Sequence, residues 1–192
     1  MHDLVIRNAN IVDGSGAPAF TGDIAVDGDR IVAVGVVEGE GRREIDAAGN
    51  LVTPGWVDIH THYDGQVTWD PEVSPSGWHG VTTIVMGNCG VGFAPADPAR
   101  REWLIQLMEG VEDIPGAALD EGMSWNWETF PEYLDEVDSM GRVLDVAALV
   151  PHGAVRAYVM GNQAAVHDQA TPEQIDAMTT IVREAIEAGA IG

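Results

Sequence analysis

The chain has 192 residues, of which 45% are hydrophobic and 21% charged, a composition typical of a globular protein rather than a disordered segment. Its net charge is −22, from nine arginines, no lysine and 31 acids, which excludes the basic patches that bind nucleic acid or anionic membranes. A single cysteine excludes an internal disulfide framework, and no apolar run approaches the roughly 18 residues of a membrane span. Because the first twenty residues also lack a signal-peptide pattern, we expect a cytoplasmic protein.

The first part of the chain is rich in short β-type runs. Strands are predicted at residues 3–12, 23–27, 30–34 and 43–46. Gly28-Asp29 separates the second run from the third and predicts a hairpin there. These runs indicate a small antiparallel β unit over residues 1–53.

After this unit, strands alternate with helices. Strands are predicted at residues 56–60, 81–86 and 144–150, with the start of a fourth at 190–192. Helices are predicted at residues 98–110, 129–139 and 172–188. The alternation favours a parallel α/β architecture, and functional-looking residues follow each strand, where a TIM barrel places its active site. We therefore assign the chain to the α/β class, with residues 54–192 as about the first half of an incomplete TIM-like (β/α) barrel that carries an insertion at residues 94–141.

The first candidate site is a pair of histidines at the end of the first predicted barrel strand. Residues i and i+2 of a strand point to the same face, so His60 and His62 are expected to project together. Two imidazoles in a barrel mouth provide half of a zinc site. The alternative is a pair of structural histidines.

The second candidate is Cys89, which lies just past the next predicted strand in a glycine-flanked loop. A thiolate there is a strong zinc ligand. The alternatives are a small buried apolar residue, or a nucleophile with one of the histidines as its base. Because a metal explains His60, His62 and Cys89 together, these three are the predicted metal ligands. His152 directly follows the third strand and can bind substrate, orient a ligand or cap the loop.

The segment 102–141 has no lysine or arginine and contains Trp103, Trp125 and Trp127. It is far longer than a usual connection between a strand and a helix. Long insertions in barrels often form lids or substrate pockets. A solvated helical elaboration whose tryptophans pack on the barrel wall is the alternative.

Taken together, these motifs resemble the amidohydrolase superfamily and, within it, the D-aminoacylase (N-acyl-D-amino-acid deacylase) family. The resemblance covers nearly the whole chain and is carried by residues 3–14, 52–62, 80–90, 125–134 and 152–161. The His-x-His pair identifies the superfamily. The Asn88-Cys89-Gly90 loop and the tryptophan stretch are more specific to the D-aminoacylase branch.

The resemblance implies a fold and a cofactor. The fold is a TIM barrel joined to a composite β-sandwich built from both chain ends, to which residues 1–53 belong. The cofactor is zinc, with one tight site and a second weaker site, and a cysteine replaces the carboxylated lysine of related hydrolases. Carried over residue by residue, His60 and His62 match the family's metal-binding histidines, and Cys89 matches its metal-binding cysteine.

The resemblance also implies an activity. An enzyme of this kind acts on carbon–nitrogen bonds other than peptide bonds, by zinc-dependent hydrolysis of the amide bond of N-acyl-D-amino acids. Tyr63-Asp64 stands where some D-aminoacylases have two acids, which places the chain in a neighbouring subgroup. We assign His152 and Tyr63 to binding of the small-molecule N-acyl amino acid.

The family's later histidine ligands and its catalytic aspartate lie on later strands, so the general base is expected beyond Gly192. We therefore expect the chain by itself to be an N-terminal fragment that is inactive and that aggregates, associates or is partly unfolded. Two other functions stay open. One is a cyclic-amide hydrolase of the hydantoinase or dihydroorotase type, and the other is a non-catalytic, truncated amidohydrolase-like chain.

Overall fold

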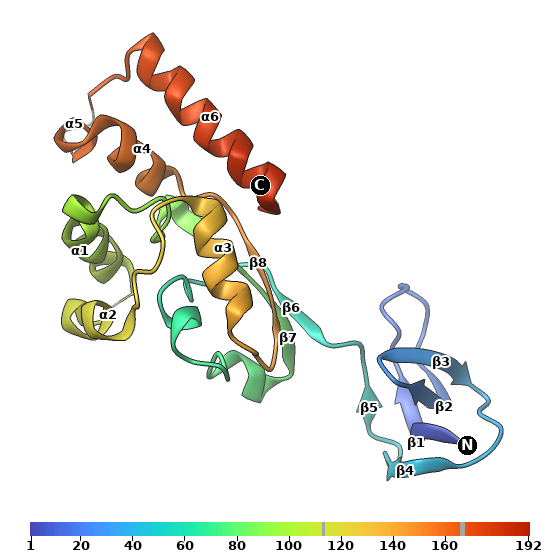
Figure 1. The fold of residues 1–192 in the computed structure, drawn as a ribbon. Helices are drawn as coiled ribbons and strands as arrows, with labels where there is room; N and C mark the ends of the chain where they lie inside the picture. The colour runs from blue at the N-terminus through green and yellow to red at the C-terminus, as the bar shows by residue number, and fades with distance from the viewer. Residues whose placement is uncertain (113, 166–167) are drawn as a thin grey trace. The chain divides into compact units, whose positions relative to one another are not determined.

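The structure is a computed structural model that describes residues 1–112, 114–165 and 168–192. The chain divides into two compact units, Met1–Gly55 and Trp56–Gly192 (Figure 1). Among the described residues, no helix combines the length and the apolar character that crossing a membrane requires.

The first unit is a five-stranded mixed sheet. Its strands are β1 (His2–Ile11), β2 (Phe20–Asp27), β3 (Arg30–Gly35), β4 (Gly41–Asp46) and β5 (Leu51–Val52). The predicted hairpin is present, because β2 and β3 pair antiparallel across Gly28. β1 also pairs antiparallel with β2, but β4 and β5 both pair parallel with β1. The expectation of a wholly antiparallel unit is therefore wrong for these two strands.

The parallel pairing is a long-range contact that needs a crossover between β3 and β4, and Arg7 is one of the residues that hold this crossover. The chain must return along the sheet between β3 and β4, and the Arg7 guanidinium donates hydrogen bonds to two carbonyls of that return segment, those of Val37 and Gly39. The same guanidinium pairs with Asp23 of β2 and with Glu44 of β4, at 2.9 and 3.0 Å. One side chain on β1 thus holds both neighbouring strands and the crossover, an arrangement that a local strand pattern does not reveal.

The second unit is built on a parallel sheet in the order β6 (Trp56–Asp58), β7 (Val81–Met86) and β8 (Asp145–Ala148). All three strands were predicted, but the first and third are shorter than expected. Residues 190–192 run beside the end of β8, where Ile191 N–H donates to the Ala148 carbonyl and Val150 N–H donates to the Gly192 carbonyl, each at 2.9 Å. This pairing agrees with the predicted start of a fourth strand.

The helices of the second unit are α1 (Arg101–Glu112), α2 (Gly116–Gly122), α3 (Phe130–Ser139), α4 (His152–Met160), α5 (Asn162–Ala165) and α6 (Pro172–Ala188). Short 3₁₀ turns are η1 (Gln66–Thr68), η2 (Ser76–His79), η3 (Asn88–Gly90) and η4 (Pro98–Arg100). α3 and α6 start where predicted, each with a capping box formed by a threonine, Thr129 or Thr171. The sequence analysis did not predict α2, α4 or α5.

The main core of the second unit packs the helices of residues 101–139 against the end of the sheet. Trp127 is buried, and its indole N–H donates to the Phe93 carbonyl at 2.7 Å. Trp125 stacks on Trp127 with ring centroids 5.4 Å apart, and Trp127 lies 5.1 Å from the Tyr133 ring. The tryptophans of this segment therefore anchor it to the rest of the unit.

Gly87 is the backbone position that brings the ends of β7 and β8 together. Its φ is +82°, and a Cβ there would lie 2.1 Å from the Leu149 carbonyl oxygen. We expect Gly87→Ala to lower the free energy of unfolding by about 2 kcal/mol or more, because it adds both a clash and backbone strain. The measurement is urea denaturation of the protein expressed from its complete gene.

The matched control is Gly110→Ala, at an exposed helical glycine with no atom near the added Cβ. Removing a glycine from a helix stabilises it by up to about 1 kcal/mol, so this variant should be neutral or more stable than the wild type. Equal denaturation midpoints for the two variants would contradict the account of Gly87.

Candidate metal centre

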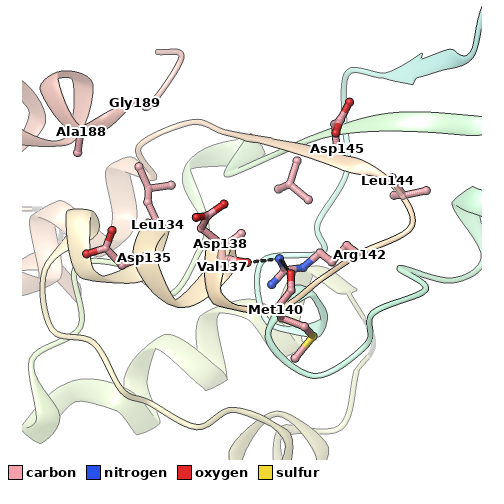
Figure 2. A pocket seen from close by; sticks show the side chains of 11 residues that line it. Leu134, Asp135, Val137, Asp138, Met140, Arg142, Leu144, Asp145, Ala188 and Gly189 are labelled. Atoms are coloured by element: carbon pink, nitrogen blue, oxygen red, sulfur yellow. Dashed lines mark hydrogen bonds between the residues drawn. The ribbon is translucent and has the colours of Figure 1, made fainter. Parts of the chain in front are cut away.

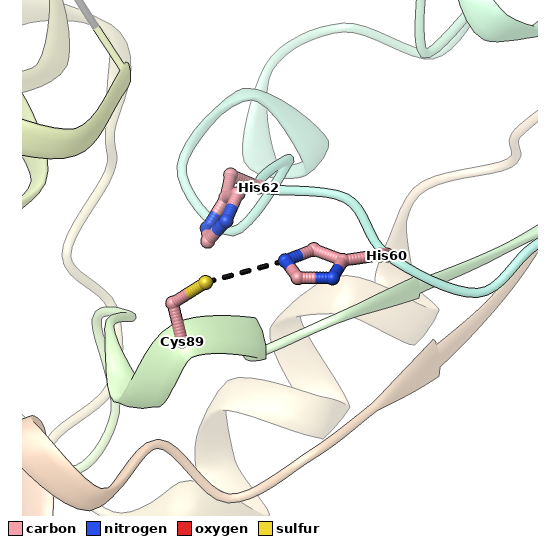
Figure 3. Close-up of side chains that lie close together, drawn as sticks. All are labelled: His60, His62 and Cys89. Carbon is pink, nitrogen blue, oxygen red and sulfur yellow. Dashed lines mark hydrogen bonds between the residues drawn. The ribbon is translucent and has the colours of Figure 1, made fainter.

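Three side chains with metal-binding atoms gather at the carboxyl ends of β6 and β7. They are His60, His62 and Cys89, whose donor atoms all lie within 4.8 Å of one another and point toward a common centre (Figure 3). His60 Nε2 is 3.2 Å from Cys89 Sγ, and the two imidazole rings are 5.4 Å apart at their centroids. Within the part of the chain that the structure describes, no other group of three His, Cys, Asp or Glu side chains comes as close.

The histidines reach this position by a route that the sequence analysis did not foresee. β6 ends at Asp58, so His60 and His62 lie in the following loop and not on one face of a strand. Thr61, between them, is buried, and both its backbone N–H and its hydroxyl donate to the Val85 carbonyl, at 3.0 and 2.8 Å. With Thr61 fixed inward, the two imidazoles on either side of it reach the same cluster.

Asn88 joins the histidine loop to the cysteine loop. Its side-chain amide donates to the Val85 carbonyl at 2.9 Å and to the Thr61 carbonyl at 3.2 Å. The Val85 oxygen therefore accepts three hydrogen bonds, two of them from Thr61. Because Cys89 follows Asn88 directly, this network sets the position of the thiol relative to both histidines.

Cys89 itself has a left-handed backbone, with φ +54° and ψ +10°. This conformation costs a non-glycine residue roughly 1–2 kcal/mol, so it persists only where the surroundings impose it. Gly90 and Gly153 provide that constraint. A Cβ on Gly153 would lie 2.7 Å from the Gly90 carbonyl oxygen, so the backbone at the start of α4 packs in direct contact with η3.

The two predicted substrate-binding residues lie in different pockets, each of which includes part of the cluster. Tyr63 shares a cavity of about 360 Å³ with His60 and His62. Its hydroxyl is hydrogen-bonded to the Ser76 hydroxyl at 2.9 Å. His152 is exposed at the first position of α4 and lines a cavity of about 690 Å³ together with Cys89.

The wall of the Tyr63 cavity depends on two residues that the sequence analysis missed, Gln66 and Asp70. The Asp70 carboxylate accepts hydrogen bonds from the Gln66 amide and from the Ser74 N–H and hydroxyl, at 2.8 to 2.9 Å, and from the Glu72 N–H at 3.0 Å. Burial opposes the charge on Asp70, but these donors outweigh it and lower its pKa to about 2. The signal in the sequence was the turn-forming Asp70-Pro71, which predicts a local turn but no link to the site.

A separate cavity of about 560 Å³ lies at the other end of the strands, between the ends of α3 and α6 and the start of β8 (Figure 2). Arg142 dominates it, donating to the Val67 carbonyl at 2.8 and 3.0 Å and to the carbonyls of Met140 and Val137. Burial lowers the pKa of Arg142. The Arg142 N–H groups satisfy free carbonyls at the end of α3. Because this end of a parallel barrel usually contributes to stability and not to catalysis, we assign this cavity a structural role.

The family follows from a match over most of the chain. A sequence model described as the amidohydrolase family matches residues 43–192. The chain belongs to the amidohydrolase family. Residues 43–192 include the whole cluster, so the candidate metal centre lies within the matched segment.

Known relatives match over the whole chain. A D-aminoacylase from Alcaligenes xylosoxydans xylosoxydans is 35% identical over 191 residues, which is 99% of this chain and 37% of that protein. A D-aminoacylase structure, described as having a binuclear metal centre with one-metal activation and second-metal attenuation, superposes with a TM-score of 0.82 at 35% identity, over 100% of this chain and 38% of that one.

A third relative adds a bound metal. The N-acyl-D-glutamate deacylase from Bordetella bronchiseptica, complexed with zinc and a phosphonate that mimics the tetrahedral intermediate, has a TM-score of 0.75 and 31% identity over 100% of this chain and 37% of that one. The chain thus spans less than two fifths of the length of the relatives that it matches. The α/β fold, with its small β unit and partial barrel, is confirmed by these superpositions.

The Asp70 network predicts a pH-dependent contribution to stability. Because the pKa of Asp70 is depressed to about 2 in the folded protein, its contribution is complete above the unfolded-state value near 4 and is lost as the pH falls toward 2. Allowing for partial solvent exposure, we expect Asp70→Ala to cost about 1 kcal/mol at pH 7. The difference from wild type should shrink below pH 4, measured by urea denaturation at a series of pH values.

Asp120→Ala, at an exposed carboxylate on α2, is the control and should change stability little at any pH. A cost for Asp70→Ala that stays constant from pH 7 to pH 3 would show that the carboxylate charge is not what holds the loop.

Proposed function

We propose that this chain forms part of a zinc-dependent enzyme that hydrolyses the amide bond of N-acyl-D-amino acids. The observation that carries the proposal is the convergence of His60, His62 and Cys89 at the carboxyl end of a parallel sheet, in a chain of the amidohydrolase family. The similarity to D-aminoacylase and to N-acyl-D-glutamate deacylase, which covers all or nearly all of this chain, supports the choice of substrate class.

The donor set fits zinc. Two imidazole nitrogens and one thiol are borderline-soft ligands that suit zinc, whereas magnesium and calcium prefer oxygen. His60, His62 and Cys89 would hold the metal, which would act as a Lewis acid on the amide carbonyl and lower the pKa of a water molecule. We propose one tight site and a second weaker one, in line with the binuclear centre described for D-aminoacylase.

The remaining residues of the chain orient these ligands and the substrate. Thr61 and Asn88 fix the two ligand loops through the Val85 carbonyl. Tyr63 and His152 line the two cavities next to the ligands, where they would contact substrate. None of the three side chains of the cluster is a carboxylate. We propose that the general base comes from beyond Gly192, so that residues 1–192 alone are inactive.

We propose the same two-part organisation that the sequence suggested. Residues 1–53 would form one part of a composite β-sandwich, and residues 54–192 would begin the barrel, with residues 94–141 inserted into it. A chain with a single cysteine has no internal disulfide and fits a reducing compartment, so we propose a cytoplasmic location.

The activity prediction uses the protein expressed from its complete gene. We expect hydrolysis of N-acetyl-D-amino acids, with the L-enantiomers cleaved far more slowly, and no turnover of hydantoin or dihydroorotate. The measurement is release of free amino acid. Preferential opening of the cyclic amides would favour the hydantoinase type, and no turnover of any amide would favour a non-catalytic chain.

The metal prediction concerns Cys89. We expect Cys89→Ala to weaken zinc binding by about 100-fold or more, because the thiolate is the one anionic ligand of the cluster. The readouts are zinc content after dialysis and, in cobalt-loaded protein, loss of the thiolate-to-metal charge-transfer absorption. His79→Ala, at an exposed histidine outside the cluster, should retain both. If the charge-transfer absorption is unchanged in Cys89→Ala, Cys89 is not a metal ligand.

A further inference from the structure

The cavity of about 690 Å³ beside Cys89 differs in charge from the chain as a whole. The chain has 31 acids, yet none lines this cavity. Its described lining residues are Cys89, Gly90, Val91, Trp103, Leu107, His152, Gly153, Arg156 and Ala164. Its volume lies within the range of roughly 300–1,000 Å³ that is usual for small-molecule pockets.

The apolar wall of this cavity comes from α1. Trp103 and Leu107 are four residues apart and therefore lie on one face of the helix. Both are half-buried and pack against the main core, so their positions are fixed. Gly153 allows the start of α4 to approach this wall, because a Cβ there would lie 3.1 Å from Leu107 Cδ2.

The polar residues of the cavity disfavour a cationic ligand. Arg156 lines it, and its guanidinium also donates to the Asp168 carbonyl at 3.0 Å. His152 is exposed at the same rim. Without a carboxylate among the lining residues, a cationic group would lose hydration and gain no counter-charge, whereas an uncharged apolar group would contact the Trp103 and Leu107 wall.

We propose that this cavity binds an uncharged apolar group of the N-acylated amino acid, its side chain or its acyl chain, and that Trp103 and Leu107 determine specificity for that group. The inference rests on the proposed function, because Cys89 links the cavity to the metal cluster. The insertion that contains α1 would then form the wall of the cavity that selects the bound group.

The test compares hydrolysis of three probes by the protein expressed from its complete gene. The reference is N-acetyl-D-alanine, N-acetyl-D-phenylalanine enlarges the side chain, and N-hexanoyl-D-alanine enlarges the acyl chain. We expect Trp103→Ala to lower kcat/KM for one enlarged probe by about tenfold relative to the reference, because that probe loses its wall. The affected probe identifies which group occupies the cavity.

Two further variants guard against a simple folding defect. Leu107→Trp should narrow the cavity and lower kcat/KM for the same enlarged probe relative to N-acetyl-D-alanine. Trp78→Ala removes an indole that is 72% exposed and does not line the cavity, so its probe preference should match the wild type. If neither Trp103→Ala nor Leu107→Trp changes the preference of an active enzyme, the inference is wrong and the proposed function stands.

Binding measurements separate the inference from the activity. Calorimetric titration of chelator-treated protein with N-acetyl-D-phenylalanine and N-hexanoyl-D-alanine should show tighter binding of one enlarged probe than of N-acetyl-D-alanine, and Trp103→Ala should abolish the difference. Selective binding by the chelator-treated protein, together with no hydrolysis by the zinc-loaded protein, would support the cavity and overturn the proposed function. A wild type that neither binds nor cleaves any probe would overturn both.

Discussion

The carbonyl of Val85 is the point on which the candidate metal centre depends. It lies in β7, one residue before the strand ends and one residue beyond the last pair that β6 forms with that strand. Since β6 has already ended, the Val85 carbonyl accepts hydrogen bonds from the backbone N–H and hydroxyl of Thr61 and from the side-chain amide of Asn88. A buried carbonyl that loses its partners costs roughly 1–3 kcal/mol, so this arrangement resists rearrangement. The three predicted ligands are all adjacent in sequence to these donors.

Close backbone approach completes the site. Gly87 allows the end of β7 to meet the Leu149 carbonyl, and Gly153 allows α4 to meet η3. These contacts place the cavity that contains Cys89 and the cavity that contains the histidines around a single cluster. The lining of the cavity beside Cys89 contains no acid, although the chain as a whole is strongly acidic.

The sequence predicted those parts of the structure that local patterns encode. The β-rich runs, the alternation of strands and helices and the threonine caps of α3 and α6 are all present. The sequence also singled out the three residues that the structure brings together in the cluster, because their side chains are chemically distinctive and follow strand ends; their role as metal ligands stays a prediction. The parallel pairing of β4 was missed because it is a long-range contact, and the Arg7 hydrogen bonds that accompany it join residues 16 to 37 positions apart.

Other features were missed for similar reasons. The early end of β6 depends on the Thr61 contact with Val85, a long-range hydrogen bond that strand propensity does not report. α4 was read only as a loop after a strand, although Pro151 directly before His152 suits a helix start. Gln66 and Asp70 are polar residues in a turn, and nothing local links them to the histidine cavity.

The most direct test of the account is X-ray absorption spectroscopy of the zinc-loaded protein expressed from its complete gene. The account predicts one sulfur scatterer at about 2.3 Å together with imidazole nitrogens at about 2.0–2.1 Å from the zinc. The sulfur contribution should disappear in Cys89→Ala. A zinc shell of nitrogen and oxygen alone in the wild type would contradict the central claim that Cys89 and the two histidines form one metal centre.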